Sequence, residues 1–365
     1  MNKKTILILT AQFGAGHISA ARAIKKSILE YDNNYNIIIE NFIDASIPIM
    51  NKPMIKLYES NTKYAPGIYN YYYYLKKSFD PRLDLSNKLY TPNLIQYILD
   101  INPDLIISTF PLAASCVDNF RNKYTNKKIK TITIITDVVD SLEWIFNSTD
   151  LYFVPSSEIK NRFMQKGISP EKVKVTGVPT NTDFYNLEKT PSKKLRISFI
   201  GGGRGFFDVN ESYFYNLDNL LYNNTKIEIN IVTGKNKKLY NNLTIKKPLK
   251  NIKVHSFITD MPNFLKDVDI LVTKPGGATL FESIHSNTPI IVKNPKIGQE
   301  IENAKFIVDK GIGLIYNDDV DLTNILEKII SGDIDNTLEF IKENITSLKN
   351  SIDYKNINQY ILSCL

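Results

Sequence analysis

The chain has 365 residues, 43% hydrophobic and 23% charged, which excludes a disordered or collagen-like chain and, at about 100–200 residues per domain, predicts two domains. It has only two cysteines, which excludes a disulfide framework or a multi-cysteine metal site and fits a reducing cytosol. The net charge of +7 permits a nucleotide, an anionic lipid surface or a nucleic acid as partner.

Short apolar runs alternate with amphipathic stretches of helical length, which is the pattern of β-α-β units. The first half predicts strands at Thr5–Leu9, Ile37–Glu40, Leu105–Ser108, Thr131–Ile135 and Leu151–Val154. The longest apolar stretch, Leu105–Val117, contains Pro111 and is shorter than the roughly 18–20 residues of a spanning helix. We therefore expect no membrane span.

A polar segment around Pro191 marks the expected hinge between domains. The second half predicts strands at Arg196–Ile200, Ile227–Val232, Ile252–His255, Asp269–Thr273 and Pro289–Val292. Apolar runs without strict alternation are typical of parallel strands that helices cover on both faces. We predict two doubly wound α/β domains in tandem, over residues 1–188 and 189–350, followed by a terminal segment, 351–365.

The first strand ends in a glycine loop that contains Gly14 and Gly16 and opens a helix. Backbone N–H groups at such a helix N-terminus can bind an oxygen-rich ligand, although the short spacing fits a tight turn equally well. His17 follows at the carboxyl edge of the predicted sheet, where open α/β folds bind ligands. Its near-neutral pKa suits a general base.

Two further junctions lie in the second half. Gly201–Gly205 holds four glycines around Arg204 directly after a strand, which favours a phosphate-binding loop over a connector. The turn Lys274–Gly277 precedes a helix in which Glu282 lies about one turn in, where a carboxylate can accept hydrogen bonds from ribose hydroxyls or simply favour the helix N-terminus. Gln299 and Asn303 share one face of a later helix and suit polyol recognition.

Two segments have a weaker meaning. Asp267 and Asp269 form a D-x-D pair that we interpret as a solvated acidic pair rather than a metal–nucleotide site. The Tyr/Lys-rich segment Tyr69–Lys77, with lysines upstream, fits either a nucleic-acid patch or a membrane interface.

Leu7–Ala21, Lys274–Glu282 and Asn294–Asn303 together resemble the monogalactosyldiacylglycerol synthase and processive diacylglycerol glucosyltransferase family, in the same order and over nearly the whole chain. The resemblance implies a GT-B fold of glycosyltransferase family 28, with two Rossmann-like domains facing a central cleft and a C-terminal helix crossing back to the first domain. It implies an inverting transfer, without metal or other cofactor, from a UDP-sugar to diacylglycerol by a peripheral protein at the cytoplasmic membrane face.

By position, the resemblance assigns donor contacts and a base. His17 would be the base or would position the acceptor, near the glycine loop of Gly14 and Gly16. The donor-binding residues would be Gly202, Gly203, Arg204, Phe257, Ile258, Gly277, Thr279, Glu282, Gln299 and Glu300. Members of the family often carry a histidine between the Thr136-Asp137 pair and Trp144, which this chain lacks, so Asp137 becomes a rival or helper of His17.

An anionic membrane surface is the expected partner of the first domain, besides UDP-sugar and diacylglycerol, and a nucleic acid is not expected. The predicted membrane residues are Tyr58, Lys63, Tyr72, Lys76 and Lys77. Three alternatives stay open: N-acetylglucosaminyl transfer to a peptidoglycan lipid intermediate, a UDP-sugar epimerase, and a non-catalytic nucleotide-sugar sensor. The donor hexose, the number of sugars added and the oligomeric state are not assigned.

Overall fold

The computed structural model describes residues 3–78, 86–203, 205, 207, 209–221 and 226–365, with the backbone alone at 59, 62–64, 72, 76, 78 and 86–88. The chain divides into two compact units. Unit 1 comprises Met1–Thr182, Lys296–Gln299 and Ile352–Leu365, and unit 2 comprises Asp183–Pro295 and Glu300–Ser351.

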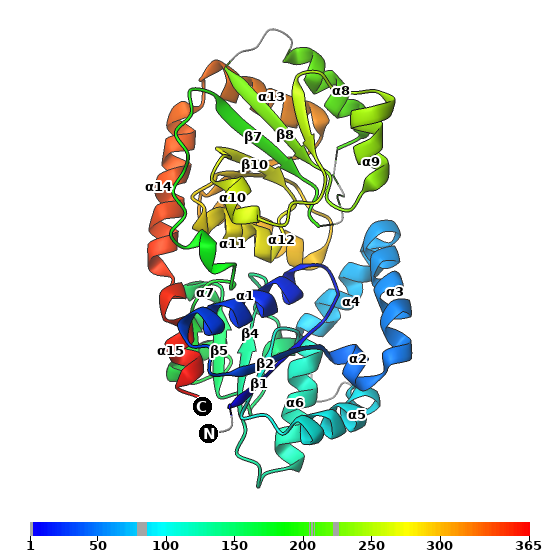
Figure 1. Ribbon diagram of the computed structural model, residues 1–365, viewed down its shortest axis with the longest axis vertical. Coiled ribbons are helices and arrows are strands. Elements are labelled where there is room, and N and C mark those ends of the chain that lie inside the picture. The colour runs from blue at the N-terminus through cyan, green and yellow to red at the C-terminus, as the bar shows by residue number, and fades with distance from the viewer. Residues whose placement is uncertain (1–2, 79–85, 204, 206, 208, 222–225) are drawn as a thin grey trace. The chain divides into compact units, whose positions relative to one another are not determined.

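Unit 1 is built on a six-stranded parallel sheet with flanking helices (Figure 1). Its strands are β1 (Thr5–Thr10), β2 (Asn36–Asn41), β3 (Leu105–Ser108), β4 (Lys130–Ile134), β5 (Leu151–Val154) and β6 (Val173–Val175). Its helices are α1 (Gly16–Tyr31), α2 (Phe42–Ser46), α3 (Asn51–Tyr64), α4 (Pro66–Ser78), α5 (Ser86–Ile101), α6 (Pro111–Lys123), α7 (Ser157–Gln165) and α15 (Ile357–Leu362). Apolar side chains of β1 and β3, including Leu7 and Ile106, are fully buried against α5 and α6.

Unit 2 repeats this architecture (Figure 1). Its strands are β7 (Leu195–Ile200), β8 (Ile227–Val232), β9 (Ile252–His255), β10 (Ile270–Thr273), β11 (Ile290–Lys293) and β12 (Gly313–Tyr316). Its helices are α8 (Glu211–Leu220), α9 (Lys237–Asn241), α10 (Met261–Leu265), α11 (Gly277–His285), α12 (Gly298–Asp309), whose first two residues belong to unit 1, α13 (Asp319–Ser331) and α14 (Asp335–Ser351).

All ten predicted strands are confirmed, with ends that differ by no more than about one residue. The prediction missed β6 and β12, the last strand of each sheet. β6 has three residues, and β12 follows Gly311 and begins at Gly313, so neither gives the long apolar run that marks the inner strands. Both strands lie at a sheet edge, where pairing to a single neighbour defines them.

The strand orders place one topological switch point in each sheet. In unit 1 the order β2-β1-β3-β4-β5-β6 reverses between β1 and β3, and in unit 2 the order β12-β11-β10-β7-β8-β9 reverses between β7 and β10. Ligands of open α/β sheets bind at the carboxyl ends of the strands beside such a reversal. The loops after β1 and β3, and those after β7 and β10, are therefore the segments to examine.

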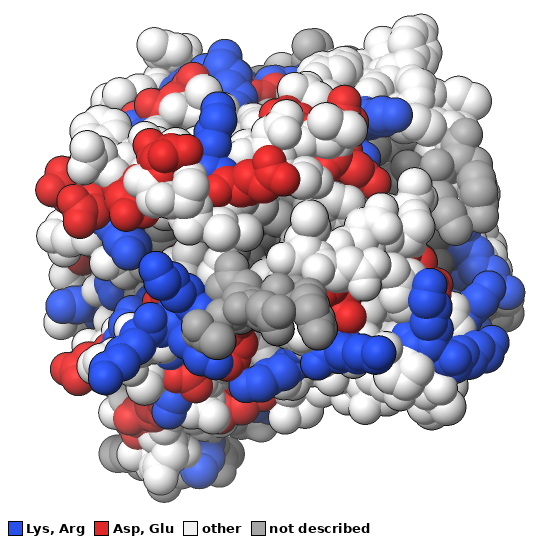
Figure 2. Space-filling model, turned by 90° about the horizontal axis from the view of Figure 1, so that it is seen from above, with Lys and Arg blue, Asp and Glu red and all other residues white. Residues whose placement is uncertain are grey.

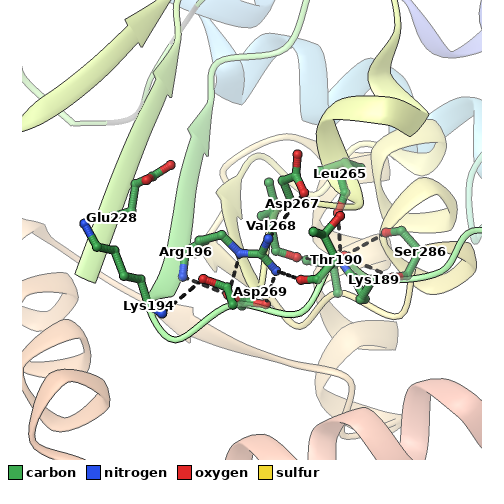
Figure 3. A network of polar contacts seen from close by, with 12 residues as sticks. Lys189, Thr190, Lys194, Arg196, Glu228, Leu265, Asp267, Val268, Asp269 and Ser286 are labelled. Atoms are coloured by element: carbon green, nitrogen blue, oxygen red, sulfur yellow. Dashed lines mark hydrogen bonds and ion pairs between the residues drawn. The ribbon is translucent and has the colours of Figure 1, made fainter. Parts of the chain in front are cut away.

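The opposite edge of the unit 2 sheet holds an ion-pair network (Figure 3). The buried Arg196 guanidinium donates from Nε to Asp269 Oδ2 at 3.1 Å and from Nη2 to Asp269 Oδ1 at 3.0 Å. Lys189 Nζ donates to the Leu265 carbonyl at 2.8 Å and to Thr288 Oγ1 at 2.6 Å, which ties the linker to this edge. The interpretation of Asp269 as part of a solvated pair was therefore wrong: it is the partner of an arginine that joins the starts of β7 and β10.

The face shown in Figure 2 carries both Lys/Arg and Asp/Glu side chains. Although the chain has a net positive charge, this face is therefore not uniformly positive.

Candidate active site

His17 lies in the first turn of α1, and long-range hydrogen bonds fix its ring. Its Nδ1 is 2.8 Å from the Thr109 carbonyl oxygen, after β3, and 2.8 Å from Thr136 Oγ1, after β4. The Thr109 hydroxyl in turn donates to the His17 carbonyl at 3.1 Å. Three strand ends thus converge on one imidazole at the unit 1 switch point.

The hydrogen bonds determine which ring nitrogen of His17 can act as a base. A carbonyl oxygen only accepts, so Nδ1 carries the proton that binds Thr109, and the lone pair of the neutral ring is on Nε2. Within the part of the chain that the structure describes, Nε2 has no partner. Although part of the residue reaches the surface, burial lowers the pKa of His17 to about 4, and the hydrogen bond to Thr109 offsets this only in part. The ring is neutral at pH 7, with a free lone pair.

The glycine loop beside His17 leaves room for a ligand. Gly14 has φ of +80°, and nothing lies within 4 Å of where a Cβ would stand at Gly14 or Gly16. No side chain caps α1 at Ala15, and its first turn has no acidic residue. Its first N–H groups are therefore suited to an oxygen-rich ligand.

Asp137 lies in the loop after β4, next to the Thr136 that contacts His17, with a partly exposed side chain. The same loop contains the short 3-10 helix η3 (Leu142–Trp144), and the buried Trp144 ring lies 6.4 Å from the His17 ring. The structure therefore brings His17 and the Asp137 loop to one place, as the sequence predicts, and adds Thr109 and Thr136, which the sequence analysis missed.

In unit 2 the loop after β7 packs backbone to backbone against the loop after β8. Gly205 has φ of +67°, and a Cβ there would come within 1.7 Å of the Thr233 carbonyl oxygen. The Lys235 amide donates to the Gly203 carbonyl at 3.1 Å, while nothing lies within 4 Å of a Cβ at Gly202. This strand-end loop is thus held from one side and open at Gly202. Arg204 lies outside the described residues.

α11 begins beside this loop, since β7 and β10 are neighbours and Thr273 Oγ1 donates to the Ile200 carbonyl at 2.8 Å. Its N-cap is Gly276, no side chain caps it, and its first turn, which includes Gly277 and the partly exposed Thr279, has no acidic residue. Such a helix start favours a phosphate. The buried Asn303, predicted for polyol recognition, instead donates to the Pro275 carbonyl at 2.9 Å and braces the turn.

Glu282 lies on α11 one turn from this start. Its side chain is partly exposed, but burial of the carboxylate raises its pKa to about 7. Among the described residues no group donates a hydrogen bond to that carboxylate. A carboxylate without a donor from the protein can accept hydrogen bonds from a ligand, which agrees with the ribose-binding role predicted for Glu282.

Phe257 and Ile258 follow β9. The Phe257 ring is 47% exposed and lies 4.0 Å from the Cβ position of Gly203, so a flat exposed surface adjoins the glycine loop. Ile258 is partly buried and packs against the core around Leu265. Gln299 belongs to unit 1, where its Oε1 accepts from the Tyr69 hydroxyl at 2.8 Å, and Glu300 is the first residue of the following segment of unit 2.

Comparisons with known proteins identify the family. Residues 17–180 match the family described as monogalactosyldiacylglycerol (MGDG) synthase, and residues 196–359 match the glycosyltransferase family 28 C-terminal domain. A processive diacylglycerol beta-glucosyltransferase from Staphylococcus haemolyticus is 31% identical over 326 residues, covering 87% of this chain and 82% of that protein. The chain belongs to this family of diacylglycerol glycosyltransferases. A relative of the same name from Bacillus subtilis is 27% identical and covers 94% of this chain and 91% of its own length.

Solved structures agree on the fold. The glycosyltransferase of kitacinnamycin superposes with a TM-score of 0.63 at 12% identity and covers all of both chains. MurG from Acinetobacter baumannii gives 0.60 at 13% identity, with 99% of each chain covered. The family member described here therefore has the two Rossmann-like domains of the GT-B fold.

The residues predicted to contact a membrane lie on helices α3 and α4, and the structure describes the side chains of only two of them, Tyr58 and Lys77. Tyr58 is partly buried and contacts the rings of Phe13 and Tyr69. Lys77 forms an ion pair with Asp140 at 3.0 Å. Both side chains, which were predicted to face a membrane, are thus engaged within the protein. The side chains of Lys63, Tyr72 and Lys76 lie outside the described residues. Large exposed apolar side chains on these helices include Leu57 and Ile68, and Tyr71 and Leu75 of the Tyr/Lys-rich segment.

No helix in the described ranges is long and apolar enough to cross a bilayer. Across the same residues no group of three or more His, Cys, Asp or Glu side chains could hold a metal ion.

Proposed function

We propose that this chain transfers a hexose from a UDP-sugar to the free hydroxyl of diacylglycerol, with inversion at the anomeric carbon. The observation that carries the proposal is His17: a neutral imidazole whose Nδ1 is committed to Thr109 and whose Nε2 lone pair is open, at a switch point of the first sheet. Family membership supplies the substrate class, and the relatives are named as diacylglycerol glucosyltransferases.

In the proposed reaction, His17 Nε2 accepts the proton of the diacylglycerol hydroxyl as its oxygen attacks carbon 1 of the hexose. The bond from carbon 1 to the phosphate oxygen breaks on the opposite face, and UDP leaves with the electron pair. The hydrogen bond from Nδ1–H to Thr109 keeps the ring oriented when Nε2 gains the proton. Asp137 helps to stabilise that positive charge or replaces His17 as the base.

Most of the proposed donor contacts belong to unit 2; Gln299 belongs to unit 1. Backbone N–H groups of the loop at Gly202 and Gly203 and of the α11 start at Gly277, with Thr279, stabilise the departing diphosphate. The Glu282 carboxylate accepts the two ribose hydroxyls, which supply the donors that it lacks, and Phe257 and Ile258 adjoin the uracil. Arg204 pairs with the phosphates, and Gln299 and Glu300 bind hexose hydroxyls. The transfer uses no metal and no cofactor besides the donor.

The protein attaches peripherally to an anionic membrane at its cytoplasmic face, through α3 and α4. Ile68, Tyr71 and Leu75 recur at helical spacing on α4 and are 68%, 71% and 52% exposed. Lys52 and Lys56 on α3 are exposed beside Leu57. Exposed apolar side chains with nearby lysines suit insertion at the headgroup boundary of anionic lipid.

The test is incubation of the purified chain with diacylglycerol vesicles and UDP-glucose, UDP-galactose or UDP-N-acetylglucosamine, followed by mass analysis of lipids and nucleotide sugars. The proposal expects hexosyl-diacylglycerol with one of the first two donors. UDP-sugar interconversion without a lipid product, transfer only to a peptidoglycan lipid intermediate, or UDP-sugar binding without turnover would each overturn it.

A further inference from the structure

The loop between β4 and β5 contains several residues close to His17, and it also contains Asp140. The loop contributes Thr136 to the His17 ring, Asp137 to the proposed site and Trp144 as a buried neighbour. Ser141, directly after Asp140, accepts a hydrogen bond from the Glu143 amide and so starts η3, which holds Trp144. In the sequence, Asp140 thus lies between Thr136 and Trp144, the two residues of this loop that adjoin the His17 ring.

Three cations, from α4, from α7 and from the residue after α7, converge on Asp140. Lys77 Nζ of α4 lies 3.0 Å from Asp140 Oδ1, and Arg162 Nη1 of α7 lies 2.7 Å from Oδ2. Lys166, one residue past α7, donates from Nζ to the Asp140 carbonyl. The Asp140 side chain is only 15% exposed, so solvent screens these pairs less than it would on an open surface.

The Asp140 carboxylate is ionised at neutral pH. Partial burial raises the pKa of Asp140, but the hydrogen bond from Arg162 and the ion pair with Lys77 outweigh it and lower the pKa to about 2. The charge of Asp140, and with it the ion pairs to Lys77 and Arg162, therefore does not change with pH near neutrality.

Helix α4 packs against the same loop. Burial raises the pKa of the Tyr69 phenol, and the charges of Glu143 and Asp137, both in the loop, add to the rise. The ion pair from Lys77 to Asp140 adds to the packing of α4 against η3, which belongs to the same loop. A shift of α4 would be transmitted to the loop that borders His17.

We propose that Asp140 is a positioning residue, whose carboxylate ties the loop after β4 to α4 and α7 and thereby holds Thr136 and Trp144 against His17. This rests on the proposed role of His17 in hexose transfer. Because misplacement of a catalytic group by about 1 Å can cost roughly 100-fold in rate, loss of the carboxylate should lower kcat by about 10- to 100-fold.

Trp144 makes the loop directly observable, since it is the only tryptophan of the chain. The experiment compares wild type, Asp140→Asn, Asp140→Glu and Asp150→Asn in the diacylglycerol transfer assay and by tryptophan emission with acrylamide quenching. Asp150 is a matched control, because it is 18% exposed and forms ion pairs with Arg121 at 2.8 Å and Lys130 at 2.9 Å. It differs from Asp140 in its place, since it contacts the amino end of β4 rather than the residues near His17. All four proteins are first checked for a cooperative unfolding transition.

We expect Asp140→Asn to lower kcat and to shift Trp144 emission to the red with stronger quenching, while KM for the UDP-sugar changes little. Asp140→Glu should recover most of kcat, and Asp150→Asn should leave kcat and emission near wild type. Equal losses in Asp140→Asn and Asp150→Asn, or unchanged kcat and emission in Asp140→Asn, would overturn the proposal. A wild type without transferase activity would refute the proposed function alone, because tryptophan emission still tests the role of Asp140.

Discussion

Each of the two sheets has a buried titratable group near its switch point, and burial shifts the pKa values of the two groups in opposite directions. In unit 1, burial lowers the pKa of His17 to about 4, and in unit 2, burial raises the pKa of Glu282 to about 7. Each group is driven toward its neutral form, because burial penalises charge. The difference lies in the partners: His17 is held by Thr109 and Thr136, whereas no described residue donates to the Glu282 carboxylate.

This contrast distinguishes a preorganised group from one that a ligand completes. His17 already has the tautomer that a base needs, so it requires no rearrangement before it accepts a proton. Glu282 is an acceptor whose donors must come from outside the protein, which is expected of a binding residue. We therefore expect the loops of unit 1 to serve proton transfer and those of unit 2 to bind the donor.

The largest expected effect is on turnover in His17→Ala. Because a positioned base typically contributes about 10²–10⁴-fold in rate, kcat for diacylglycerol glycosylation should fall by that factor. UDP affinity, measured by calorimetric titration, should stay close to wild type. Asp137→Asn is the paired variant: full activity in His17→Ala together with collapse in Asp137→Asn would move the base to Asp137.

The next effect is on donor binding in Glu282→Gln. Hydrogen bonds to a charged group contribute roughly 1.5–3 kcal/mol, so the dissociation constant for UDP should rise by about 10- to 150-fold. The ionised carboxylate is the form that accepts two hydroxyls, so wild-type affinity should increase as pH rises through about 7. Uridine, which has no phosphate to titrate, isolates this dependence. An equal pH profile in wild type and variant would remove Glu282 from the site.

Stability should respond to pH with opposite signs at the two positions. The folded pKa of His17 lies below 6.5, so the stability linked to it is present above pH 6.5 and is lost as pH falls toward 4. The folded pKa of Glu282 lies above 4.5, so its contribution is present below pH 4.5 and is lost as pH rises toward 7.

Relative to wild type, His17→Gln should therefore gain stability at pH 5 compared with pH 8, and Glu282→Gln should gain it at pH 8 compared with pH 5. At about 1.4 kcal/mol per pKa unit, each difference is at most about 3 kcal/mol. Denaturant unfolding at the two pH values measures both. Differences of the same sign would show that burial does not set the two pKa values.

An effect of at most this size distinguishes the surfaces of the two units. Ile68→Ser and Leu75→Ser on α4 should each weaken sedimentation with anionic vesicles, since a buried large apolar side chain is worth about 1.5–3 kcal/mol. Leu220→Ser on α8 is the matched control in unit 2, because Leu220 is 59% exposed. If all three variants sediment like wild type at low and high salt, α4 does not carry membrane attachment.

The sequence predicted the strands and the loops at their ends, because apolar runs and glycine turns are local signals. It placed His17 at a sheet edge, since the residue directly follows the first strand and its glycine loop. It could not predict Thr109 and Thr136 as partners of His17, because those contacts join residues 92 and 119 positions away. The hydrogen bond from Asn303 to the Pro275 carbonyl could not be predicted for a related reason. From the sequence alone, an amide on a helix face can bind either a ligand or a distant backbone carbonyl.

The surface of α3 and α4 shows the same limit. Tyrosines and lysines marked the segment, but ring contacts turn Tyr58 inward, and the ion pair with Asp140 occupies Lys77. Which face of a helix remains exposed depends on packing against distant elements. The exposed stripe of Ile68, Tyr71 and Leu75 emerged only once the structure was known.

The division of roles between the two units is tested most directly by measuring kcat and UDP affinity on the same preparations of His17→Ala and Glu282→Gln. The account predicts a crossed result: His17→Ala loses kcat and keeps UDP affinity, while Glu282→Gln loses UDP affinity to a much larger degree than kcat at saturating UDP-hexose. Parallel losses of both quantities in both variants would contradict it.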